Sequence, residues 1–147
     1  MIQRIQSVFL VIVVACSVCL LVFPFISYEN LFNTFTLRAF NQPYCGFWYY
    51  LAEALNMISM LISLICIFLF KKRMLQFRLT NIIALINTIL LAVLLFAKTA
   101  IVDDFLGGTR HTLWPSYIPT VAMVFAYLAG IFIKKDEELV RSADRIR

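Results

Sequence analysis

Residues 79–97 read LTNIIALINTILLAVLLFA, an uncharged run in which only Asn81 and Asn87 are strongly polar. The hydrocarbon core of a bilayer is about 30 Å thick and takes about 20 apolar residues of helix. Because no water inside it can bind backbone N–H and C=O groups, a closed helix is the only economical conformation for such a run. The stretch therefore predicts a membrane-spanning helix and argues against a strand.

The composition of the whole chain points to the same class of protein. Of its 147 residues, 63% are hydrophobic and 14% are charged, whereas soluble domains average about 45–50% and 25%. The mean hydropathy of +0.90 excludes a disordered chain, which needs few apolar residues and many charges. These values exclude an ordinary cytosolic domain and predict an integral membrane protein.

Three further apolar runs complete a four-span pattern. We expect membrane helices at about residues 5–26, 51–70, 79–99 and 115–134. They leave outer loops at 27–50 and 100–114, an inner loop at 71–78 and a tail at 135–147. The predicted fold class is an all-α integral membrane protein, an antiparallel four-helix transmembrane bundle that forms a single membrane domain.

The distribution of Lys and Arg predicts the orientation of the spans, because basic residues accumulate on the cytoplasmic side. Ten of the 13 basic residues fall on one side, namely Arg4, Lys71, Lys72, Arg73, Arg78, Lys134, Lys135, Arg141, Arg145 and Arg147. The other side has Arg38, Lys98 and Arg110. We therefore expect both termini in the cytoplasm and anionic lipid head groups as partners of the basic clusters. No nucleic-acid partner is needed to explain the net charge of +5.

The outer loops predict a small β-hairpin-like cap. Polar and apolar residues alternate from Thr34 to Ala39, which is typical of a short strand. In the second loop Gly107 and Gly108 separate 103–106 from 109–113, which is a hairpin signal. We expect the two loops to pair.

Small residues recur at spacing four on three of the predicted helices. The stripes are Ser59 with Ser63, Ala84 with Thr88 and Ala92, and Ala122 with Ala126 and Gly130. Small side chains let helix backbones approach closely in lipid, where burial from water no longer drives association. We expect the stripes to pack the four helices together, and the use of one stripe by a second copy or a larger complex is the alternative.

The tail predicts a helix that continues the last span. Leu139, Val140, Ala143 and Ile146 share one face, and Glu137 and Arg141 form an i, i+4 pair. We expect this face either to rest on the 71–78 loop or the membrane, or to dock a partner. The candidate partner or lipid contacts are Lys71, Lys72, Arg73, Arg78, Asp136, Glu137, Leu139, Val140, Arg141 and Arg145.

Residues that carry redox or metal chemistry are few and poorly placed for it. Cys16 and Cys19 form a CxxC motif near the middle of the first span, where a thiolate is disfavoured. Cys45 is the one cysteine predicted on the outer side, and His111 is the one histidine. We predict no enzyme, no cofactor and no metal, with a membrane thiol or quinone oxidoreductase that uses the cysteines as the alternative.

Three polar residues are expected within the membrane or at its edge. Glu53 and Lys98 lie near the outer ends of adjacent antiparallel spans, so they are candidates for an anchoring ion pair or for snorkelling. Asn87 lies at mid-membrane, where we expect it to bond a neighbouring helix. A carrier for a small lipid-like molecule, bound near Asn87 and the outer aromatic residues, is a further alternative.

Three segments of the chain carry a family resemblance. They read MIQRIQ at 1–6, KRMLQ at 72–76 and KDEELVRSADRIR at 135–147. They resemble domain of unknown function 4293, a family of small four-span inner-membrane proteins of Bacteroidetes-type bacteria. The resemblance covers the whole chain and implies architecture and inner-membrane location without catalytic residues. The leading hypothesis is a non-enzymatic accessory or scaffold subunit that presents its basic loop and charged tail to a protein partner or a second copy.

Overall fold

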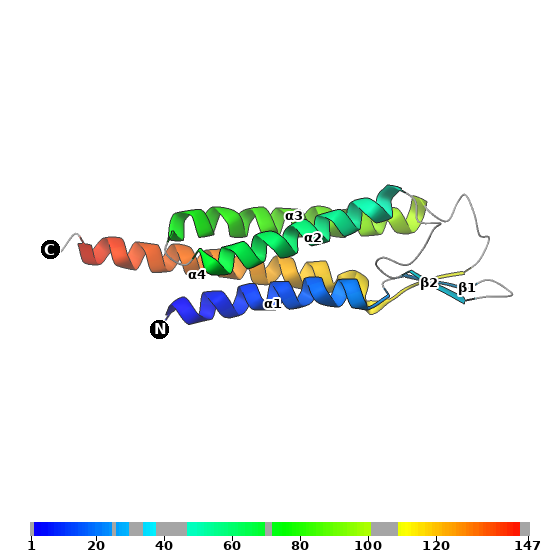
Figure 1. Cartoon of the computed structure of the whole chain (residues 1–147), viewed down its shortest axis with the longest axis horizontal. Helices are drawn as coiled ribbons and strands as arrows, with labels where there is room; N and C mark the ends of the chain where they lie inside the picture. Colours follow the sequence, from blue (N-terminus) through cyan, green and yellow to red (C-terminus); the bar gives the residue numbers. More distant parts are fainter. Residues whose placement is uncertain are drawn as a thin grey trace.

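Four long helices dominate the computed structural model, which describes residues 2–24, 26–29, 34–37, 47–69, 72–100 and 109–144. They run alternately in opposite directions (Figure 1). Their bounds are α1 (Ile2–Val22), α2 (Phe47–Phe68), α3 (Arg73–Ala100) and α4 (Ile118–Asp144). Each is long and apolar enough to cross a membrane. The predicted antiparallel four-helix membrane bundle is confirmed.

The interior of the bundle combines many small and polar side chains with a few large apolar ones, while many other large apolar side chains face outwards. Ser17, Ser59, Ser63, Ala122, Ala126 and Ala129 are among the buried residues. Val8, Val11, Leu61, Leu85 and Val124 are about half exposed on the outside. Helices in water turn their large apolar residues inwards, whereas helices in lipid pack through small residues and leave the large ones to the acyl chains.

The predicted stripe of small residues on the third helix packs against its neighbours only in part. Ala84 packs against the core cluster and Thr88 Oγ1 lies 3.1 Å from Met123 Sδ of α4, although Thr88 and Ala92 are exposed. The buried face of α3 is formed by larger residues, Ile83, Asn87 and Leu90.

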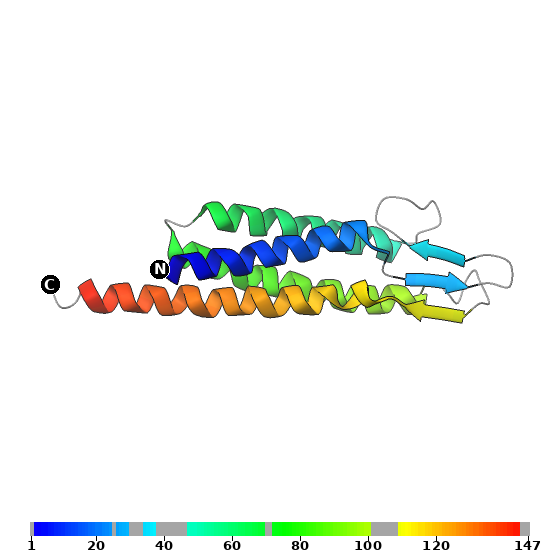
Figure 2. The ribbon, with the colours of Figure 1, turned by 90° about the horizontal axis from the view of Figure 1, so that it is seen from below.

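Three short strands form a sheet at one end of the bundle, which we call the sheet end. The central strand is β1 (Ile26–Glu29), and it pairs antiparallel with β2 (Thr34–Leu37) and with β3 (Thr109–Thr112) (Figure 2). The two outer loops therefore pair through β1 and β3. The predicted hairpin partner of 109–113, residues 103–106, lies outside the described residues.

The first helix ends earlier than predicted. The first span was expected to reach residue 26, but α1 ends at Val22 and Ile26 is already the first residue of β1. The residue before a proline is disfavoured in helical conformation, and here Phe23 precedes Pro24. The Phe23 N–H still donates to the Cys19 carbonyl at 2.9 Å, which closes the last turn.

The basic loop predicted over 71–78 is wrong, because most of this segment is helix. α3 begins at Arg73, so Arg73 and Arg78 lie in its first two turns. The N–H groups of Leu75 and Gln76 both donate to the Lys72 carbonyl, at 3.1 and 3.0 Å. Met, Leu, Gln and Arg are strong helix formers, and the segment contains no Gly or Pro to stop the helix.

The last helix extends well past the predicted end of its span. A short 3-10 helix, η1 (Trp114–Tyr117), precedes α4, which then continues without a break to Asp144. The predicted helical tail is therefore confirmed. At 1.5 Å per residue the 27 residues of α4 measure about 40 Å, which exceeds the hydrocarbon thickness of about 30 Å.

Candidate functional site

The end of the bundle opposite the sheet gathers most of the predicted contact residues. We call it the charged end and define it by the first turns of α1 and α3 and by residues 134–144 of α4. The last turns of α4 protrude beyond the start of α1 in both views (Figures 1 and 2). Lys72, Arg78, Lys134 and Lys135 are exposed here. The described structure thus brings the basic start of α3 beside the charged end of α4.

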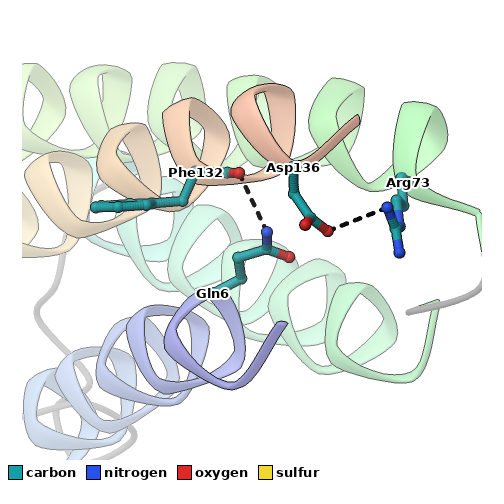
Figure 3. Close-up of polar contacts among 4 residues, drawn as sticks. All are labelled: Gln6, Arg73, Phe132 and Asp136. Atoms are coloured by element: carbon teal, nitrogen blue, oxygen red, sulfur yellow. Dashed lines mark hydrogen bonds and ion pairs between the residues drawn. The ribbon is translucent and has the colours of Figure 1, made fainter. Parts of the chain in front are cut away.

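Two polar contacts one helical turn apart fasten α4 at the charged end (Figure 3). Gln6 of α1 donates its Nε2 hydrogen to the Phe132 carbonyl at 3.2 Å. Arg73 of α3 places Nη1 at 3.2 Å from Asp136 Oδ2. We call these four residues the polar clasp, because they tie α4 to α1 and to α3 within one helical turn.

The Arg73–Asp136 ion pair is largely shielded from solvent. The two side chains are 25% and 13% exposed, so their attraction is less screened than that of a surface pair. In the described structure Arg73 Nη1 and Asp136 Oδ2 do not form a hydrogen bond. The two side chains therefore interact mainly by electrostatic attraction. Both residues were expected to contact a partner or lipid, but the structure uses them to hold two helices of the chain together.

Gln6 of the clasp was missed by sequence reasoning. It is 4% exposed, although glutamine is mostly found at protein surfaces. The sequence spacing could have shown this burial. Gln6 lies four residues before Leu10 and seven before Val13, so it shares a helical face with these two fully buried residues.

Two adjoining hollows between α3 and α4 form a groove beside the polar clasp. The larger, of about 470 Å³, is lined by Lys72, Arg73, Met74, Leu75, Glu137 and Val140. The smaller, of about 140 Å³, is lined by Arg73, Met74, Phe77, Ile133, Lys134, Glu137 and Glu138. Arg73, Met74 and Glu137 border both hollows, so the two adjoin. Met74, Leu75 and Val140 are 40–49% exposed, which gives the groove apolar walls beside charged side chains.

The other predicted contact residues are placed differently. Leu139 is exposed but does not line either hollow in the described part of the chain. Arg78 is exposed on α3. Lys71 and Arg145 lie outside the described residues, and the side chain of Arg141 is not described.

Asn87 makes its contacts inside the bundle. Its Nδ2 group donates to Ser59 Oγ on α2 at 2.8 Å and to the Ile83 carbonyl at 2.9 Å. The Ser63 hydroxyl donates to the Ser59 carbonyl at 2.8 Å, so the polar line continues along α2. The Asn87 amide thereby links α3 to α2. Its Nδ2 group donates to protein atoms inside the bundle.

Of the predicted pair of Glu53 and Lys98, the structure describes the side chain of Glu53 alone. Glu53 lies on α2 beside Asn56, and both line a small cavity between α1, α2 and α3. Among the described residues no ion pair involves Glu53. The side chain of Lys98 is not described, so the predicted pair lies outside the described residues.

The cysteines of the described helices are free thiols. Cys16 and Cys19 are half-buried on α1, and Cys66 is buried on α2. Cys66 and Gln76 exchange contacts, since Gln76 Nε2 donates to the Cys66 carbonyl at 3.2 Å and the Cys66 thiol donates to the Gln76 carbonyl at 3.7 Å. Cys45 lies outside the described residues. No group of three His, Cys, Asp or Glu side chains in the described ranges is arranged to hold a metal ion.

Four helices long and apolar enough to cross a membrane, with many large apolar side chains on the outside of the bundle, define a four-span integral membrane protein. The model of the family described as domain of unknown function (DUF4293) matches residues 2–146, and the chain belongs to this family. The resemblance seen in its three segments is thereby confirmed. No curated protein and no solved structure matches the chain at a significant level.

Proposed function

We propose that this protein is a non-enzymatic accessory subunit of a membrane complex and that it holds a partner protein in the groove between α3 and α4. We place the protein in a bacterial inner membrane with the charged end and both termini in the cytoplasm. The excess of Lys and Arg on that side supports this orientation. The observation that carries the proposal is the groove itself, in which exposed apolar side chains lie beside charged ones at the charged end.

The position of the groove favours a protein partner over the lipid acyl chains. α4 is about 10 Å longer than the hydrocarbon core is thick, and its charges begin at Lys134. Val140 and the first turn of α3 therefore lie at the level of head groups and water. Exposed apolar side chains at that level are not solvated by acyl chains, and such patches mark sites of protein contact.

The shape and charge of the groove fit a short amphipathic helix from a partner subunit. Such a helix lays its apolar face into an apolar groove and places its charges at the edges. Lys72 borders the larger hollow, Lys134 and Glu138 border the smaller one, and Glu137 borders both. We therefore expect charges of both signs along the edges of the partner helix.

Two neighbouring residues of α4 provide a matched test. Val140 lines the groove and is 40% exposed, whereas Leu139 is 49% exposed and points about 100° away around the helix. Val140→Glu should release the partner, because it buries a charge against the apolar walls, and Leu139→Glu should retain it. The measurement is a mild-detergent pull-down of each tagged variant from its own membranes, with cross-linking and mass spectrometry.

Three results are distinguishable. Loss of a stoichiometric partner with Val140→Glu alone supports the groove. Retention by both variants shows that the groove is not the docking site. Equal loss with both variants means that the whole end of α4 is required, which contradicts a site confined to the groove.

A further inference from the structure

A small cavity lies in the half of the bundle nearer the sheet end, apart from the groove of the proposed function. It measures about 30 Å³ and lies between α1, α2 and α3. Leu20 and Leu21 line it from α1, and Leu90 and Leu94 line it from α3. Because a cavity of about 10–15 Å³ is enough to hold one water molecule, this cavity has room for a ligand of that size.

One oxygen atom at this cavity is an acceptor without a donor. Asn56 lines the cavity and is 4% exposed, and its Nδ2 group donates to the Ser17 carbonyl of α1 at 3.1 Å. This bond fixes the orientation of the amide, because the reversed amide would place two acceptors, Asn56 Oδ1 and the Ser17 carbonyl, against each other. Asn56 Oδ1 is left buried without a hydrogen-bond partner in the described structure.

The walls of the cavity that come from α1 and α3 do not supply the missing donor. Their described residues are leucines, whose side chains have no polar hydrogen. Glu53 Oε1, one helical turn from Asn56 on α2, is a second buried oxygen without a partner. Buried polar atoms in proteins are normally bonded to the protein or to an ordered water molecule. The two oxygens therefore call for a ligand that donates hydrogens.

Water is the ligand whose size and chemistry fit these atoms. It has two donor hydrogens for two acceptors, and buried waters typically bond two to four polar groups that the protein leaves unsatisfied. A metal ion does not fit, because Ca²⁺ takes six to eight oxygen ligands and Mg²⁺ demands an octahedral set, whereas the lining in the described structure offers two such oxygens.

We propose that this cavity binds one water molecule, which donates one hydrogen to Asn56 Oδ1 and the other to Glu53 Oε1. The bound water satisfies the amide that ties α2 to α1 through the Ser17 carbonyl. The site is thus a hydration site inside the membrane domain. It does not depend on the partner proposed for the groove, because the groove lies at the charged end.

The test is nuclear magnetic resonance of the purified full-length protein, with protonated methyl groups, in a deuterated detergent that has no hydroxyl groups. A water molecule held in the cavity gives nuclear Overhauser cross-peaks between the water signal and nearby methyl groups. We expect these cross-peaks for Leu20 and Leu94, which line the cavity, and their loss in Asn56→Leu. The internal controls are Leu10 and Ile83, which are fully buried in another core cluster and should show none.

Hydroxyl hydrogens that exchange with water imitate such cross-peaks, and the variant separates the two sources. Asn56→Leu keeps the hydroxyls of Ser17 and Tyr49, so cross-peaks that persist in this variant overturn the proposal. Absence of the cross-peaks from the wild-type protein, or equal cross-peaks at Leu10 and Ile83, overturns it as well. If Asn56→Leu does not fold, Tyr49→Phe takes its place, because it removes the hydroxyl of a side chain that lines the cavity. Cross-peaks retained in Tyr49→Phe then support the bound water, and their loss contradicts it.

Discussion

Gly130 lies where α4 approaches α3 closely. A Cβ atom built there would lie 3.1 Å from Thr80 Oγ1 and 3.5 Å from Asn81 Oδ1. Thr80 is fully buried and donates its hydroxyl hydrogen to the Phe77 carbonyl at 2.8 Å. A single missing side chain thus lets the two backbones come together, as is typical of helices that associate in lipid.

A large side chain at this position should push α3 and α4 apart. We expect Gly130→Leu to lower the free energy of unfolding by about 1–3 kcal/mol, the usual cost of overpacking. Gly130→Ala should be much milder, because the better helix propensity of Ala, about 1 kcal/mol, offsets the tight contact. Thermal unfolding in detergent checks both. Ala92→Leu, at an exposed position on α3, is the control, and an equal loss there would contradict the packing argument.

At the scale of the element, α4 is one helix with two environments. Its first part lies in the apolar bundle, and its last turns carry the exposed side chains of Lys134, Lys135 and Glu138 at the charged end. The polar clasp lies at the boundary between these parts (Figure 3). It holds the end of α4 against α3, and so it also holds the two walls of the groove in register.

A charge exchange tests the clasp. Arg73→Asp and Asp136→Arg should each destabilise the end of α4 by about 1–3 kcal/mol, because one buried charge then meets a like charge. The double variant should recover most of this loss, since it restores an ion pair of opposite direction. Hydrogen exchange of the amides of residues 137–144 measures the effect. If the double variant exchanges as fast as the single ones, the ion pair does not hold this end.

The sequence predicted the secondary structure of most elements. It was less reliable for the segment 71–78, at the start of α3, and for the face that α3 turns towards its neighbours. The apolar runs predicted all four helices, and the amphipathic tail predicted the extension of α4. The segment 71–78 was misjudged because its charges are typical of a loop beside a membrane, while its residues are good helix formers. The α3 stripe meets its neighbours only in part, because spacing shows which residues share a face but not how far that face is turned towards a neighbour.

At the scale of the whole molecule, the two ends of the bundle differ in kind. One end carries the three-stranded sheet, and the other carries the polar clasp, the groove and the protruding turns of α4 (Figures 1 and 2). Most of the Lys and Arg residues belong to the second end. A membrane separates these ends, so each meets a different aqueous phase.

The orientation can be measured with single cysteines in a chain whose four natural cysteines are replaced. Ser142 is exposed at the charged end and Phe47 at the sheet end. In intact spheroplasts, a membrane-impermeant thiol reagent should label Phe47→Cys but not Ser142→Cys, because basic residues accumulate on the cytoplasmic side. Permeabilised spheroplasts should label both, as the control. The reverse pattern in intact spheroplasts would show that the charged end lies outside.

The sequence by itself determined the class of protein and the four helices, because these depend on hydrophobic length, which is a local property. It also indicated Arg73, Asp136 and Asn87 as residues of interest. Only the tertiary structure decided that Arg73 binds Asp136, that Asn87 binds Ser59, and that Glu53 and Asn56 share a cavity. These pairings depend on the rotation of each helix about its axis, which is set by packing between segments distant in the chain and leaves no periodic signal in any one of them.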